Sequence, residues 1–377
     1  MPTALTHYAR LLDRIFGAGT ARFDQTAEGS NNVVRALAST TDFLVFRQNF
    51  EARLHRLASA VAADPSLRAE IVGALNRIVD NGWDGAFAEL SALDYFLVDP
   101  LTGPGNVALD VTVPALDTLG SDLGMTHANH DLRFPQLGVA LDTKMLTDKT
   151  GGILEGVFKD FRKNKGIKSL VINPSYNPDD DFAPYAEHRR ALLKELVDNV
   201  DVHVRPPRLV SRVIPYLSYN FMWDAGVSVG VGEYSPRTHA EHHHRLLFGH
   251  AKKFSRVEPT VLTMVTFPWA GEQALGFDEE VTREFFRTLG ERFFVDYLSS
   301  TEQAHSFHSK FQTAISAAEV TRHLSGLVFL EDRTITGQGG GDLNIAASYV
   351  WNPHAIHQLS GHAFERVLQA RGAYKLS

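Results

Sequence analysis

Residues 130–144 (His-Asp-Leu-Arg-Phe-Pro-Gln-Leu-Gly-Val-Ala-Leu-Asp-Thr-Lys) constrain the fold more than any other stretch of this chain. The Pro-Gln-Leu-Gly segment is a turn signal, and the apolar and β-branched residues around it predict a short strand over 138–144. Because side chains alternate along a strand, Val139, Leu141 and Thr143 share one face, which suits a core. The other face ends in a carboxylate beside an ammonium group. We therefore expect two short strands joined by a tight turn, with charged groups at the strand ends.

The charged residues of this segment suit a metal-assisted reaction. Asp131 opens the first strand, and the triplet Asp142-Thr143-Lys144 closes the second. Mg²⁺ prefers oxygen ligands, usually one or two carboxylates together with waters and substrate phosphates. Asp131 and Asp142 can supply the carboxylates, and Lys144 can hold the attacking water or offset charge in the transition state. The alternative is a surface hairpin with an ordinary Asp–Lys pair.

A third acid lies on a predicted helix over 86–97. Glu89, Leu93 and Phe96 are spaced at i, i+4 and i+7, so Glu89 falls within or beside the apolar stripe. A carboxylate within such a stripe is costly unless it is paired or metal-bound. The pattern leaves two interpretations open, a site residue or a side chain that reaches water at the edge of the stripe. Were Glu89 far from the other acids, Asp94 or Asp110 would be the candidate.

A helix acid, a strand acid and an Asp-x-Lys strand, in this chain order, resemble the PD-(D/E)XK nuclease superfamily. No proline precedes Asp131, where the name-giving motif has one. The resemblance implies an α/β protein with a restriction-endonuclease-like core, a mixed central sheet flanked by helices. It implies catalytic roles for Glu89, Asp131, Asp142 and Lys144. It further implies Mg²⁺, with Mn²⁺ as a substitute, bound by Asp131, Asp142, Glu89 and the Thr143 carbonyl. The implied activity is hydrolysis of DNA phosphodiester bonds, in restriction, defence or repair.

The order of the remaining elements fits a mixed sheet covered by helices. Further strands are predicted at 169–173, 260–267, 325–330 and 347–353, and helices at 153–163 and 243–257 precede the first two of them. The last strand ends in Asn-Pro, which is similar to uncharacterised bacterial members of the superfamily. We divide the chain into a helical N-terminal region, 1–75, and a nuclease-like core, 76–377. An insertion rich in Pro, Asp and Tyr is expected around 174–240.

Composition narrows the class of protein. The chain has 377 residues, of which 44% are hydrophobic and 21% charged, so a large core is expected and disorder is not. The absence of cysteine excludes disulfides, thiol nucleophiles and cysteine-ligated zinc, and it fits a cytoplasmic protein. The first residues lack the apolar run of a signal peptide. No apolar stretch approaches the length of a membrane span, so no membrane partner is expected.

Charge bears on the expected DNA partner. The net charge of −7 argues mildly against nucleic-acid binding, so local clustering matters more. Four basic residues crowd into the helix-like stretch after the Asp-x-Lys strand: Lys159, Arg162, Lys163 and Lys165. They can contact phosphates, although a solvated helix face is the alternative. A second basic cluster is Lys252, Lys253 and Arg256. A homodimer would provide one site for each strand of a duplex.

Two rival functions remain open. One is a catalytically inactive nuclease-fold DNA-binding protein. The other is a histidine-based metallohydrolase, because His239 and His243 have the i, i+4 spacing of helical zinc ligands. His130 can tune the acidic site, and the alternative is an ordinary loop histidine. The glycine-rich segment 337–342 lacks the Lys-Ser/Thr ending of a phosphate-binding loop, and we interpret it as a flexible loop.

Overall fold

The structure is a computed structural model that describes residues 4–17, 32–39, 41–80, 83–114, 127–146, 149–167, 169–176, 183–223, 236–237, 240, 247–267, 279–304, 315–337 and 343–376. The chain forms two compact units. Unit 1 comprises residues 1–146 and 243–377, and unit 2 comprises residues 147–242. Each unit has its own sheet and its own hydrophobic core.

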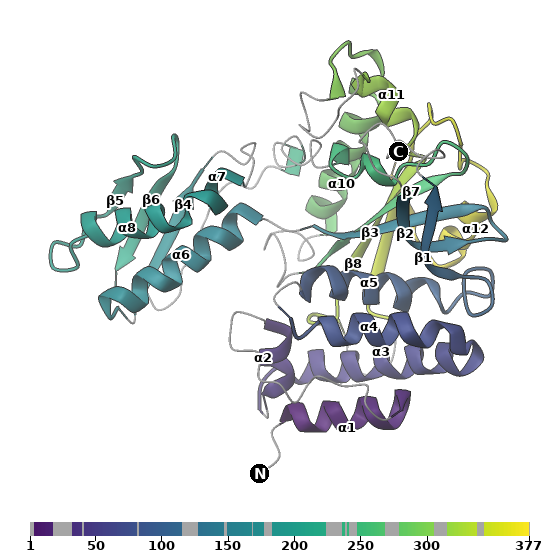
Figure 1. Cartoon of the computed structure of the whole chain (residues 1–377), viewed down its shortest axis with the longest axis horizontal. Coiled ribbons are helices and arrows are strands. Elements are labelled where there is room, and N and C mark those ends of the chain that lie inside the picture. The colour runs from purple at the N-terminus through teal and green to yellow at the C-terminus, as the bar shows by residue number, and fades with distance from the viewer. Residues whose placement is uncertain are drawn as a thin grey trace. The chain divides into compact units, whose positions relative to one another are not determined.

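A seven-stranded mixed sheet forms the centre of unit 1 (Figure 1). Its strands, in spatial order, are β1 (Ala108–Pro114), β2 (His127–Phe134), β3 (Val139–Met145), β7 (Thr260–Thr266), β8 (Gly326–Asp332), β9 (Ile345–Trp351) and β10 (Tyr374–Lys375). β1, β2 and β3 are antiparallel, whereas β3, β7 and β8 run parallel to one another. β9 is antiparallel to β8, and β10 is parallel to β9. The predicted mixed α/β class is confirmed.

Helices from the N-terminal part of the chain are stacked over one face of this sheet (Figure 1). They are α1 (Ala4–Phe16), α2 (Asn32–Ala38), α3 (Leu44–Ala63), the 3₁₀ turn η1 (Pro65–Leu67), α4 (Arg68–Arg77) and α5 (Trp83–Phe96). α5 packs on β3, β7 and β8, and α4 packs on α5. The side chains of Val139 and Leu141 enter this core, as the alternation along the strand predicts. The helical region 1–75 therefore shares one core with the sheet.

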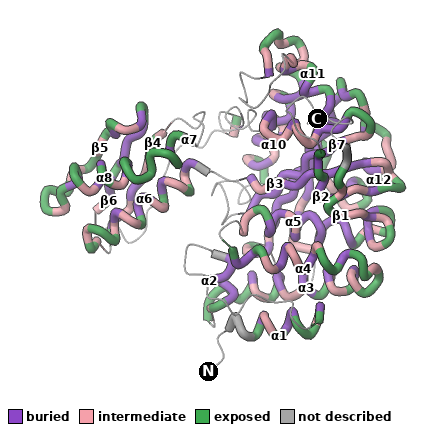
Figure 2. The backbone as a smooth tube through the Cα atoms, in the orientation of Figure 1, coloured by how far each residue is buried: buried purple, intermediate pink, exposed green. Residues whose placement is uncertain are grey.

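Both faces of the central strands are covered. The second layer contains η4 (Ala251–Lys253), α10 (Glu279–Phe294), η5 (Asp296–Ser299) and α11 (Ala317–Arg322), and α12 (Ala363–Ala370) follows β9. On β8, Val328 belongs to the α5-side core, whereas Phe329 stacks on Phe286 of α10 with 3.9 Å between ring centroids. β7 and β8 are buried along their whole length (Figure 2). Residues on both faces of these strands are buried, as coverage of both faces requires.

A buried ion network joins α3 to α5 and β8. Arg53 lies between two carboxylates, with its Nε 3.0 Å from Asp94 Oδ2 and an Nη 2.6 Å from Asp332 Oδ2. Arg56 also binds Asp94, at 2.7 Å. Buried charges are tolerated when they are paired and hydrogen-bonded, as these are. The network fixes the helical layer on the sheet.

Unit 2 is smaller and differs from the prediction in where it begins. It contains α6 (Lys149–Lys165), β4 (Leu170–Ser175), α7 (Ala183–Glu187), α8 (Arg189–Asn199), β5 (Arg208–Val210) and β6 (Ser218–Trp223). β4, β6 and β5 form a separate antiparallel sheet. The insertion expected around 174–240 therefore starts near 147, because α6 buries Val157, Phe158 and Phe161 against α8 and β6. Among the described residues, no helix combines the length and apolar character that a membrane crossing requires.

Candidate active site

The β2–β3 hairpin brings Asp131, Asp142 and Lys144 together. Leu132 of β2 pairs with Leu141 of β3. Asp131, next to Leu132, and Asp142, next to Leu141, therefore lie on neighbouring strands. Asp131 Oδ2 accepts a hydrogen bond of 2.6 Å from the Thr143 N–H. Lys144 Nζ lies 2.8 Å from Asp142 Oδ2 and 3.9 Å from Asp131 Oδ2. Three of the four predicted catalytic residues are therefore adjacent.

The turn between the strands is the one that the sequence predicts. Gly138 has a φ of 62°, a left-handed conformation that glycine adopts without steric cost, and its N–H donates to the Phe134 carbonyl over 2.9 Å. β2 is longer than expected, because it begins at His127 and pairs with β1 along most of its length. Asp131 thus lies inside β2, next to Leu132, which pairs with both β1 and β3.

Asp142 is a buried carboxylate held by two ammonium groups. Its side chain is fully buried, with Lys144 Nζ at Oδ2 and Lys253 Nζ 3.0 Å from Oδ1. Burial by itself raises the pKa of a carboxyl group, but the positive charges of Lys144 and Lys253 outweigh it and hold the pKa of Asp142 below its usual value. Asp142 is therefore ionised at neutral pH.

The pKa of Asp131 is shifted in the opposite direction from that of Asp142. Burial, and then the negative charge of Asp142, raise the pKa of Asp131 to about 7, against the opposing effects of Lys144 and the Thr143 N–H. Burial acts to lower the pKa of Lys144, but the charges of Asp142 and Asp131 together outweigh it and raise that pKa, so this lysine remains an ammonium ion. Two neighbouring carboxyl groups with oppositely shifted pKa values are a recognised mark of functional sites.

Glu89 is in the vicinity but has another hydrogen-bond partner. It lies on α5 and forms an ion pair with Arg77 of α4. Burial raises the pKa of Glu89, while Arg77 and, more weakly, Lys144 oppose that rise. Leu93 and Phe96 are buried, whereas the Glu89 side chain is 33% exposed, so this acid lies at the edge of the apolar stripe. Glu89 therefore interacts with the site through the charge of Lys144.

The two alternative acids, Asp94 and Asp110, lie on α5 and β1. Asp94 belongs to the buried network with Arg53 and Arg56. Asp110 lies on β1 with a φ of 46°, in the left-handed region.

Lys253 is a site residue that the sequence prediction missed. The range 243–257 was expected to be one helix; of its described residues, 247–248 are α-helical and 251–253 form the separate turn η4, which ends where Phe254 becomes extended. This single turn lies against β2 and directs Lys253 to Asp142, where its Nζ also donates to the Asn129 carbonyl. The signal in the sequence was the basic cluster at 252–256, which gave no indication of the long-range contact.

His130 is buried behind the acids. Its side chain is on the buried face of β2, which alternates with the face of Asp131. Neither ring nitrogen has a hydrogen-bond partner among the residues that the structure describes, and burial lowers the pKa of His130 although Asp142 opposes this. A neutral imidazole therefore lies next to the site.

The donor set determines which metal the site can hold. It comprises the carboxylates of Asp131 and Asp142 and the carbonyl of Thr143, which accepts a bond of 3.0 Å from Lys144 Nζ. No group of three or more His, Cys, Asp or Glu side chains is gathered as a metal site in the described part of the chain. Mg²⁺ needs only one or two carboxylates, since water and phosphate oxygens complete its shell. The residues fit Mg²⁺, with lysines as the counter-ions of the carboxylates.

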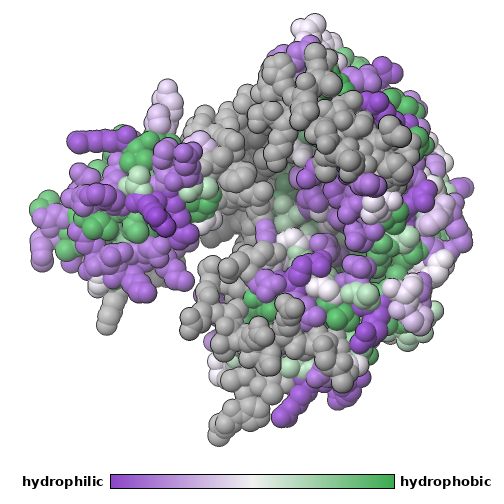
Figure 3. Space-filling view, in the orientation of Figure 1, coloured by the Kyte–Doolittle hydropathy of each residue, from purple (hydrophilic) through white to green (hydrophobic). Residues whose placement is uncertain are grey.

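The predicted DNA-contacting residues lie on α6 of unit 2. Lys159 and Lys163 are exposed there, and Lys165 is half-buried. Arg162 instead bonds Glu155 at 2.5 Å and the Leu170 carbonyl at 3.3 Å. Much of the unit 2 surface seen in Figure 3 is hydrophilic. His239 and His243 lie outside the described residues, as does most of the glycine-rich loop, residues 338–342.

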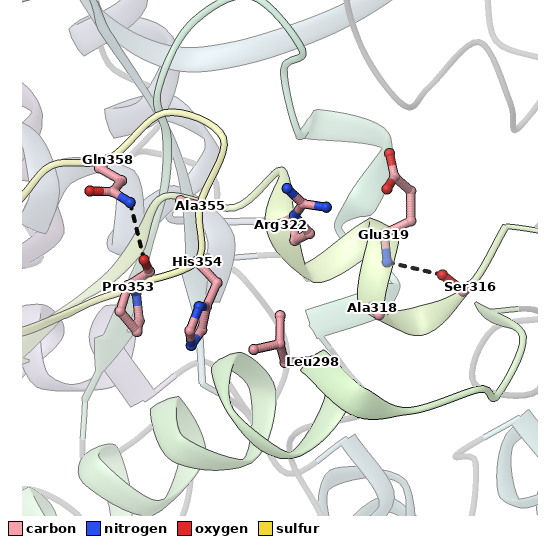
Figure 4. A pocket seen from close by; sticks show the side chains of 9 residues that line it. All are labelled: Leu298, Ser316, Ala318, Glu319, Arg322, Pro353, His354, Ala355 and Gln358. Atoms are coloured by element: carbon pink, nitrogen blue, oxygen red, sulfur yellow. Dashed lines mark hydrogen bonds between the residues drawn. The ribbon is translucent and has the colours of Figure 1, made fainter.

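A cavity of about 580 Å³ lies elsewhere in unit 1, between η5, α11 and the loop after β9 (Figure 4). Two of its polar side chains are engaged with nearby backbone. Gln358 donates to the Pro353 carbonyl over 3.1 Å, and Ser316 caps α11 by accepting from the Glu319 N–H. The acids of the hairpin line no part of this cavity, so the chemistry of the site is separate from it.

Comparisons with protein-family models, with curated proteins and with solved structures find no match to this chain.

Proposed function

We propose that this chain is a metal-dependent nuclease with a restriction-endonuclease-like core, which hydrolyses DNA phosphodiester bonds with Mg²⁺ or Mn²⁺. The observation that carries the proposal is the position of Lys144, within 4 Å of two carboxylates on neighbouring strands. Helix α5, which carries the helix acid, packs on β3, which carries the Asp-x-Lys triplet. This packing also supports the proposal. The setting we propose is restriction, defence or repair.

Charge balance supports a reaction on phosphate. Ionised Asp131 and Asp142 are offset by Lys144 and Lys253, so the four side chains together are neutral. A bound divalent ion would add two positive charges. A phosphodiester carries one negative charge and gains another as hydroxide attacks it, so the metal-loaded site complements the transition state better than the substrate.

The roles of the side chains follow from their protonation states. Asp142 is ionised and Asp131 titrates near neutrality, so both can act as oxygen ligands. The bound metal would lower the pKa of its water and stabilise charge on the phosphate. Lys144 remains an ammonium ion, so it donates hydrogen bonds and orients the attacking water rather than removing its proton. Glu89 would support the site through its influence on Lys144.

Exposed Lys159 and Lys163 on α6 support DNA as the substrate, because regularly placed ammonium groups bind backbone phosphates. A homodimer would allow both strands of a duplex to be cut.

The test is cleavage of supercoiled plasmid, single-stranded DNA and RNA in Mg²⁺, Mn²⁺ or EDTA. Wild type is compared with Asp142→Asn, which removes the ionised ligand while nearly keeping the shape of the side chain. We expect wild type to cut DNA in Mg²⁺ or Mn²⁺ but not in EDTA. We expect Asp142→Asn not to cut DNA under any of these conditions. Cutting in EDTA, or cutting that survives Asp142→Asn, would refute the proposal.

A further inference from the structure

Lys253 forms an ion pair with one of the two carboxylate oxygens of Asp142. Its Nζ lies 3.0 Å from Asp142 Oδ1, and its side chain is only 14% exposed. Besides this ion pair, Lys253 Nζ donates a hydrogen bond to the Asn129 carbonyl on β2. The contact joins two segments far apart in the sequence, and it closes the side of Asp142 that Lys144 leaves open.

We propose that Lys253 is an internal counter-ion that competes with the divalent metal for Asp142. This inference rests on the proposed function, because it concerns the same site. Asp142 has two oxygen atoms, and an ammonium group contacts each of them. Mg²⁺ binds carboxylate oxygens at about 2.0–2.1 Å and repels a cation at hydrogen-bonding distance from the same atom. Metal binding therefore requires Lys253 to move away from Oδ1.

The two lysines differ in their capacity to move. Lys144 lies on a hydrogen-bonded strand between two acids, so it remains close to both when one of them binds metal. Lys253 ends a single 3₁₀ turn, after which the backbone becomes extended at Phe254. Its long, flexible stem allows the ammonium group to turn away without a change in the sheet. Lys253 is thus a positioning residue, and Lys144 is the catalytic one.

The structure also explains what the competing lysine does for the metal-free protein. A buried, ionised carboxylate needs a compensating charge. Lys253 supplies that charge until a metal replaces it, so the site folds without metal at the cost of weaker metal binding. A neutral side chain of similar length in place of Lys253 should therefore tighten metal binding.

The experiment measures Mn²⁺ binding to the metal-free, full-length protein without DNA, from the electron paramagnetic resonance signal of free Mn²⁺. The variants are Lys253→Met, Asp142→Asn and Lys252→Met, the last being a matched control on the same turn. We expect Lys253→Met to bind Mn²⁺ about tenfold more tightly than wild type, which corresponds to about 1.4 kcal/mol. Lys252→Met should match wild type, and Asp142→Asn should abolish binding.

The outcomes separate the two proposals. Equal affinity of wild type and Lys253→Met, with binding lost in Asp142→Asn, overturns the competition but keeps the metal site. Mn²⁺ binding by Lys253→Met, with none by wild type, supports the competition and means that Lys253 blocks metal binding in wild type. No binding by either protein overturns both proposals. Should Lys253→Met fail to fold by circular dichroism, Lys253→Gln serves as the neutral variant, because it keeps a donor for the Asn129 carbonyl. Lys253→Arg keeps the charge and should retain wild-type affinity.

Discussion

Asp131 contributes to the pH dependence of the stability of this protein, and Asp131→Asn should remove that contribution. Burial and the charge of Asp142 raise the pKa of Asp131 from its ordinary value of 3.8 to about 7. One pKa unit corresponds to about 1.4 kcal/mol, so a shift of roughly three units corresponds to about 4 kcal/mol. The asparagine cannot ionise, and its side-chain oxygen can still accept the hydrogen bond from the Thr143 N–H.

The sign follows from where the proton is bound. Between about pH 4 and about pH 7, the folded protein keeps the Asp131 proton while the unfolded chain has released it. The stability contributed by this group is therefore fully present below about pH 4 and is lost as the pH rises through about 7. Of the total, about 3 kcal/mol should be lost between about pH 5 and about pH 8.

The assay is urea unfolding of wild type and Asp131→Asn at pH 5 and pH 8, followed by tryptophan fluorescence. The free energy of unfolding of the variant, relative to wild type, should increase by about 3 kcal/mol from the lower to the higher pH. An unchanged difference would mean that Asp131 is not buried beside a second charge. A decrease would reverse the sign and refute the electrostatic account of the site.

Three further predictions concern the fold and the DNA contact. Arg53→Met leaves Asp332 buried without its ion-pair partner and should lower the free energy of unfolding by about 3–5 kcal/mol; a loss below 1 kcal/mol in urea unfolding would contradict the network. Gly326→Ala places a Cβ in steric conflict with the ring of Trp351 and should cost about 1–3 kcal/mol by the same assay, whereas unchanged stability would show that the strands have room to adjust. Lys159→Ala should weaken DNA binding and reduce its salt dependence by about one phosphate contact; an unchanged slope in fluorescence anisotropy would remove α6 from the interface.

The parts of the fold that local patterns specify were predictable. The turn before β3 and the alternation along it were correct, because a period of two and a glycine turn are local signals. The strands expected at 260–267, 325–330 and 347–353 correspond to β7, β8 and β9. The helix expected over 86–97 corresponds to α5.

The parts that depend on long-range contacts were not predictable. β4 has the pattern of a buried strand, but nothing local indicates that it joins a second sheet with β6. Lys253 approaches Asp142 only because η4 lies against β2. The apolar stripe of α5 did not indicate which side chain pairs with Glu89. The ion pair with Arg77 forms because α4 packs on α5.

The most direct test of the nuclease proposal is single-turnover cleavage of a labelled DNA duplex in Mg²⁺ by wild type, Lys144→Ala and Lys252→Ala. Each protein is first shown to be folded by its melting temperature. We predict that Lys144→Ala loses at least about a hundredfold in rate, since it removes the group that we propose orients the water and stabilises charge, while Lys252→Ala cuts like wild type. Equal cleavage by wild type and folded Lys144→Ala would contradict the assignment of this site.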